Sequence, residues 1–134
     1  MMISNELLAE YAKNPANKGM IPDATISRRE TNRLCDDAIT VHLRIENDRI
    51  VGFGFEGDTA IVTTACASIF GESIIDMAVD EILSLDEHYI RENLGIEVTH
   101  RRRQSSVFAL LATRNALHEW RGDGIVDDFA SVLQ

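Results

Sequence analysis

Hydrophobic and polar positions alternate most clearly in the second quarter of the chain. Every second residue over 39–45 is apolar, and the same two-residue period returns over 51–55. This alternation is typical of strands that bury one face. Asn47-Asp48 lies between the two stretches, and a pair of such residues favours a tight turn. The pattern predicts an antiparallel hairpin.

The period changes after Gly57. Small and branched apolar residues over 59–73 predict a buried helix, and apolar residues at helical spacing predict a long helix over 102–120. A weak strand is expected over 24–31, and shorter helices over 4–13, over 79–85, from Asp86 to before Gly95, and over 125–133. Strands therefore precede most helices. The predicted class is α+β, with a three-stranded antiparallel sheet packed against helices and residues 1–134 forming one domain.

Charge and composition limit the classes of function that fit the chain. The chain has 13 basic and 22 acidic residues among 134, a net charge of −9. That balance disfavours general nucleic-acid binding and docking on anionic membranes, both of which depend on Lys and Arg. We find no signal peptide and no apolar run long enough to span a bilayer. Two cysteines are too few for a secreted disulfide scaffold. We therefore expect reduced thiols and a location in the cytoplasm.

Cys35 and Asp37 are the strongest candidates for chemistry. Residues two apart in an extended segment project to the same side, so this thiol and carboxylate could share a metal. The alternative is a half-buried cysteine beside two solvated acids, Asp36 and Asp37. Cys66 falls inside the predicted buried helix, where packing is the favoured role. No catalytic motif is present, so we do not expect an enzyme.

The run Arg101–Arg103 opens the predicted long helix, where cations oppose the helix dipole. The run could dock an acidic partner or an anion. It could equally be a solvated basic turn.

Four segments together resemble one family. They are NPANKG from Asn14, Cys-X-Asp at Cys35, FEGDTAIVTTACAS from Phe55, and LGIEVTHRRRQSSVFALLATRNAL from Leu94. In this order they resemble the iron–sulfur cluster assembly scaffolds IscU, SufU and the N-terminal domain of NifU. The resemblance implies the SufE/IscU-like fold and an iron or iron–sulfur cofactor. It also implies that Cys35 is a cluster ligand and that Asp37 is the aspartate that keeps the cluster labile.

The chain departs from the family where ligands are expected. Ala60 and Ser105 occupy the positions of the second and third cysteines, and Gln104 replaces a histidine or lysine. Asp36 stands where glycine is usual. The resemblance therefore implies a scaffold-like protein that is degenerate in cluster ligation, with Cys35, Ala60, Gln104 and Ser105 converging at one end of the molecule.

Three alternatives stay open from the sequence. The chain could be a SufE-like sulfur acceptor that uses Cys35. It could be a non-catalytic protein-interaction or regulatory domain. It could also be a homodimer that bridges a cluster with Cys35 and Asp37 from each chain. The resemblance implies a cysteine desulfurase or another iron–sulfur assembly protein as partner.

Overall fold

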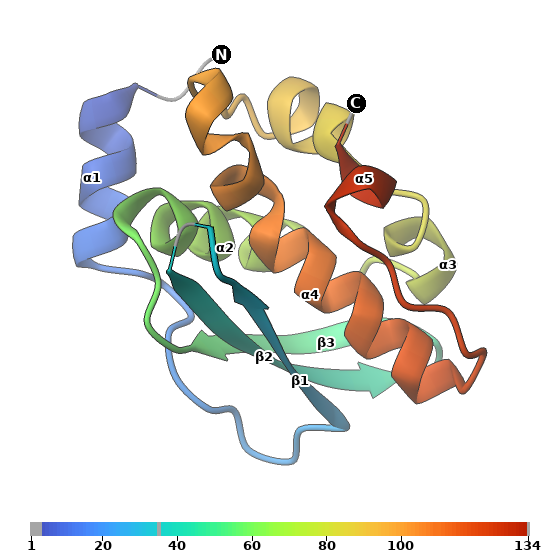
Figure 1. Cartoon of the computed structure of the whole chain (residues 1–134). Coiled ribbons are helices and arrows are strands. Elements are labelled where there is room, and N and C mark those ends of the chain that lie inside the picture. Colours follow the sequence, from blue (N-terminus) through green and yellow to red (C-terminus); the bar gives the residue numbers. More distant parts are fainter. Residues whose placement is uncertain (1–3, 35, 134) are drawn as a thin grey trace.

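The structure is a computed structural model that describes residues 4–34 and 36–133. Cys35, which carries the predicted metal chemistry, lies outside the described residues. Three strands form one layer, and the helices gather on one face of it (Figure 1). The elements are α1 (Asn5–Lys13), β1 (Ile26–Asn32), β2 (Asp37–Glu46), β3 (Arg49–Glu56), α2 (Ile61–Ser73), α3 (Val79–Ile82), the π-helical turn η1 (Tyr89–Asn93), the 3-10 turn η2 (His100–Arg102), α4 (Arg103–Arg121) and α5 (Phe129–Val132).

The sheet is an antiparallel meander with β2 in the middle. Asn47 and Asp48 join β2 to β3 with φ of 53° and 58°, and Glu46 pairs with Arg49 across them. Two successive positive φ values mark a type I′ turn, whose twist matches that of the strands. The predicted hairpin is confirmed, and the predicted weak strand over 24–31 forms as β1.

α2 and α4 cover the inner face of the sheet (Figure 1). Nine of the 13 residues of α2 are buried, which confirms the predicted buried helix. The predicted long helix is α4, which also packs against α2. The core that these elements enclose includes Val41, Leu43, Phe55, Phe70, Phe108 and Leu110. Among the described residues, no helix is both long and apolar enough to cross a membrane.

The NPANKG segment is fixed to both the sheet and α2. The Phe55 N–H donates to the Asn17 carbonyl at 3.1 Å, and the Gly19 N–H donates to the Phe55 carbonyl at 2.6 Å. The Ala16 N–H donates to the Ser68 hydroxyl at 2.9 Å. Gly54 leaves room for this approach, because a Cβ there would lie 2.5 Å from the Gly19 carbonyl oxygen. The segment is therefore held beside the end of β3 that leads into α2.

The predicted helix from Asp86 to before Gly95 forms over 87–93, and its last five residues are the π-helical turn η1. The Asp86 carboxylate caps it by accepting a hydrogen bond from the His88 N–H at 2.8 Å. One predicted helix differs in the structure. The final helix begins at Phe129 instead of residue 125. Side chains of α4 form hydrogen bonds with the backbone and side chains over 123–127, and these contacts hold the stretch in a non-helical conformation.

Candidate functional site

Asp37 is the first residue of β2, and its carboxylate reaches the N-terminus of α2. Oδ1 accepts a hydrogen bond from the Ala60 N–H at 2.7 Å, and Oδ2 accepts one from the Thr63 hydroxyl at 2.7 Å. The α2 helix has no side-chain cap of its own. A carboxylate is favourable there because unpaired N–H groups and the positive end of the helix dipole face it. Asp37, only 3% exposed, therefore caps α2 from another element.

Asp36 stands where the family motif has glycine, and its backbone explains that preference. Its φ is 56°, in the left-handed region. Glycine adopts this conformation freely, and aspartate is among the few other residues that tolerate it. The family departure at Asp36 therefore preserves the backbone turn that leads into β2.

Gln104 brings the start of α4 to the same end of the sheet. Its Oε1 accepts a hydrogen bond from the Asn32 amide at 3.0 Å, and Asn32 pairs with Asp37 across β1 and β2. Since Asp37 also holds Ala60, these contacts bring Ala60 and Gln104 to one end of the molecule, as the resemblance predicts. Ser105 follows Gln104 and is 7% exposed.

Cys66 lies in the core, as predicted. It is 1% exposed, and burial raises the pKa of its thiol to about 12 because the apolar surroundings disfavour the thiolate. At neutral pH this thiol is protonated. It is therefore unsuited to bind a metal or attack an electrophile.

The side chains at the family's ligand positions can be compared with those that hold an iron–sulfur cluster. Iron–sulfur clusters are held mostly by thiolates. At the family's ligand positions, Ala60 offers a methyl group and Ser105 a hydroxyl, and both Asp37 oxygens already accept hydrogen bonds. Within residues 4–34 and 36–133, no three His, Cys, Asp or Glu side chains gather as a metal site. These described residues do not fit a conventional cluster.

The arginine run divides into two parts. Arg103 makes a two-pronged ion pair with Glu87, with N–O distances of 2.7 and 2.6 Å. That hydrogen bond with Glu87 raises the pKa of Arg103. Arg101 and Arg102 are exposed and line a depression with the apolar side chains of Leu8, Val62 and Val98. The run is thus partly structural and partly open to a partner.

Sequence reasoning missed Asn32 and Thr63 as parts of this site. Asn32 is 5% exposed, and its Oδ1 also accepts a hydrogen bond from the Leu34 N–H at 3.2 Å. Thr63 is fully buried at the start of α2. The burial that makes the Asn32 amide need partners is visible only in the fold. Nothing in the local sequence marks Thr63.

Comparisons with known proteins agree with this geometry. Residues 3–125 match the family described as the NifU-like N terminal domain. The chain is 35% identical over 94 residues to the iron–sulfur cluster assembly scaffold protein IscU of Thermotoga maritima, which covers 70% of this chain and 66% of the relative. It is 26% identical over 82 residues to the zinc-dependent sulfurtransferase SufU of Bacillus subtilis, which covers 61% and 55%. The chain thus matches less than two thirds of the length of either relative.

The fold also has solved counterparts. The crystal structure of the N-terminal part of a nitrogen-fixing NifU-like protein from Brucella abortus superposes with a TM-score of 0.72 at 16% identity. The superposition covers 90% of this chain and 95% of that one. The family match spans nearly the whole chain, and the fold agrees with it. The chain therefore belongs to the NifU-like N-terminal domain family, the iron–sulfur cluster assembly scaffolds that include IscU and SufU.

Proposed function

We propose that this protein acts in iron–sulfur cluster assembly as a scaffold-like protein whose single chain does not complete a conventional cluster site, and that it is not itself a catalyst. The observation that carries the proposal is the donor set at the end of the sheet. Contacts with Asp37 and Asn32 bring Ala60 and Gln104 to this end, and Ala60 and Ser105 supply no thiolate.

Cys35 and Asp37 are the residues we assign to iron. Two hydrogen bonds leave the Asp37 carboxylate with unused lone pairs, because an ionised carboxylate has about four acceptor positions. Ligands from a second copy of the chain would complete the set. The proposed partner is a cysteine desulfurase or another iron–sulfur assembly protein, in keeping with the family. Location in the cytoplasm stays a prediction.

The two cysteines allow a matched test. The protein is purified without oxygen as wild type, as Cys35→Ser and as Cys66→Ala, and its iron content is measured. Each protein is then incubated with a cysteine desulfurase and cysteine. In this step the enzyme's persulfide sulfur passes to a thiolate of the chain and the enzyme's own thiolate leaves. Mass spectrometry then locates any added sulfur atom.

We expect iron, added sulfur or both on the wild type and on Cys66→Ala, and neither on Cys35→Ser. Serine keeps the shape but forms no ready thiolate. Cys66→Ala removes a buried sulfur, so a thermal melt accompanies it as a folding check. Equal iron and equal labelling in the wild type and Cys35→Ser would contradict the site. No iron and no label in any variant would favour the interaction-domain alternative.

A further inference from the structure

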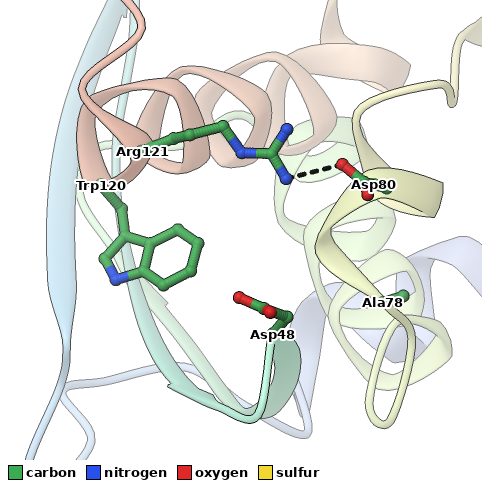
Figure 2. A pocket seen from close by; sticks show the side chains of 5 residues that line it. All are labelled: Asp48, Ala78, Asp80, Trp120 and Arg121. Atoms are coloured by element: carbon green, nitrogen blue, oxygen red, sulfur yellow. Dashed lines mark hydrogen bonds and ion pairs between the residues drawn. The ribbon is translucent and has the colours of Figure 1, made fainter.

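A second polar pocket lies away from the candidate site. Asp48, Ala78, Asp80, Trp120 and Arg121 line a cavity of about 400 Å³ (Figure 2). Asp48 follows the far end of β2, whereas Asp37 begins that strand. Nine residue steps of about 3.3 Å place the two strand ends about 30 Å apart. A partner seated in this pocket would leave the candidate site free.

Asp48 gives the pocket an unpaired negative charge. The hairpin turn fixes its backbone, and its carbonyl accepts a hydrogen bond from the Val79 N–H at 2.9 Å. Its carboxylate forms no hydrogen bond or ion pair with any described residue. Figure 2 shows it pointing into the space between the Trp120 ring and the Arg121 guanidinium.

The other two walls are an aromatic ring and an ion pair. Trp120 is partly buried and packs against the hydrophobic core, so its indole forms a firm aromatic wall. Arg121 and Asp80 form an ion pair at 2.6 Å that largely cancels their charges. The lining therefore carries one negative charge in excess, that of Asp48.

From this geometry we infer that the pocket binds an arginine side chain of a partner protein. A guanidinium stacks on an aromatic face and offers paired N–H donors to a carboxylate. Trp120 and Asp48 supply those two surfaces, from α4 and from the β2–β3 turn. The protein's net charge of −9 favours the approach of a basic partner. The inference is independent of the proposed function and adds a second docking point at the opposite end of the sheet.

Trp120 is the only tryptophan in the chain, so its fluorescence reports on this pocket alone. The probe is N-acetyl-arginine amide, titrated at constant ionic strength, with the Asp48 and Val79 amide signals in NMR as a second readout. Nα-acetyl-citrulline amide is the neutral control. Nα-acetyl-lysine amide, with a free ε-ammonium group, is the control for a cation that is not planar. Free arginine is titrated in parallel, to test whether the pocket prefers a free amino acid to the side chain of a protein.

We expect saturable changes with the blocked arginine, weaker binding of the lysine probe and none with the citrulline probe. Asp48→Asn should weaken arginine binding about three- to tenfold, as loss of a charged but exposed hydrogen-bond partner does. The matched control is Asp23→Asn, since Asp23 is also an exposed aspartate with positive φ, of 57°, and does not line the pocket. Asp23→Asn should leave binding unchanged.

Three results with the blocked probes or with Asp48→Asn would overturn the inference. They are an unsaturable or absent response, equal responses to the arginine and citrulline probes, and no effect of Asp48→Asn in a protein that melts as the wild type does. Tighter binding of free arginine than of the blocked probe would also overturn it, because the occupant would then be a free amino acid.

Discussion

At the residue scale, the central finding is the role of Asp37. The resemblance marks Asp37 as a metal-site residue, and the structure shows that its carboxylate also caps α2. The two hydrogen bonds join residues 23 and 26 positions apart. Local patterns cannot reveal such a contact, because it exists only after β2 and α2 pack together. By contrast, the core position of Cys66 followed from the apolar residues around it.

Replacing Asp37 therefore affects stability as well as any metal. We expect Asp37→Ala to lower the free energy of unfolding by about 2 to 3 kcal/mol, because it removes two hydrogen bonds to a charged group and leaves the buried Thr63 hydroxyl unpaired. Urea unfolding of metal-free protein measures the change.

Asp36→Gly is the matched control for that measurement. It removes a neighbouring carboxylate that is exposed and places glycine at a φ that glycine prefers. Its free energy of unfolding should stay within about 0.5 kcal/mol of the wild type. A loss as large as that of Asp37→Ala would show that general charge, and not the cap, stabilises this end of the protein.

At the element scale, the sequence predicts regular elements well and irregular ones poorly. The hairpin and the two long helices are evident because each repeats its own period over many residues. The stretch over 123–127 has no period, and its conformation depends on α4. His118 lies between Asp123 at 2.7 Å and Asp127 at 3.1 Å, while the Asn115 side chain bonds the Asp127 backbone in both directions. Gly122, with φ of 69°, turns the chain back to make these contacts.

This arrangement predicts a pH-dependent contribution from Asp123. The hydrogen bond with His118 is the largest cause that lowers the pKa of Asp123 from its ordinary value of 3.8. A carboxylate whose pKa is lower in the folded protein than in the unfolded chain stabilises the fold at pH values above the ordinary pKa, here 3.8. That stabilisation is lost as the pH falls from 3.8 through the lowered pKa. The wild type should therefore be more stable than Asp123→Asn near pH 5, with the difference shrinking as acid is added.

Urea unfolding at a series of pH values from 5 downward tests this contribution. Asp23→Asn serves as the reference variant, because the Asp23 carboxylate has no hydrogen bond or ion pair with the described residues. A difference between wild type and Asp123→Asn that stays constant with pH would contradict the account of the His118 contact.

At the scale of the whole molecule, fold and site were predictable to different degrees. The α+β class followed from the order of strands and helices. The candidate site positions came from the resemblance alone, because Ala60 and Gln104 come to one end of the molecule only through contacts among β1, β2, α2 and α4. Neither local spacing nor composition indicated that Asn32 and Thr63 would join them. The fold is that of the scaffold family, and we propose that the chain differs from the family in its set of donors.

The most direct test of this account is anaerobic reconstitution with ferrous iron and sulfide. The wild type is compared with the double variant Ala60→Cys/Ser105→Cys, which restores the two family cysteines. Iron and sulfide are counted per chain in the monomer fraction from gel filtration, and absorption spectra are recorded. We expect no stoichiometric cluster on the wild-type monomer and a gain of bound iron and sulfide on the double variant. A stoichiometric cluster on the wild-type monomer would contradict it.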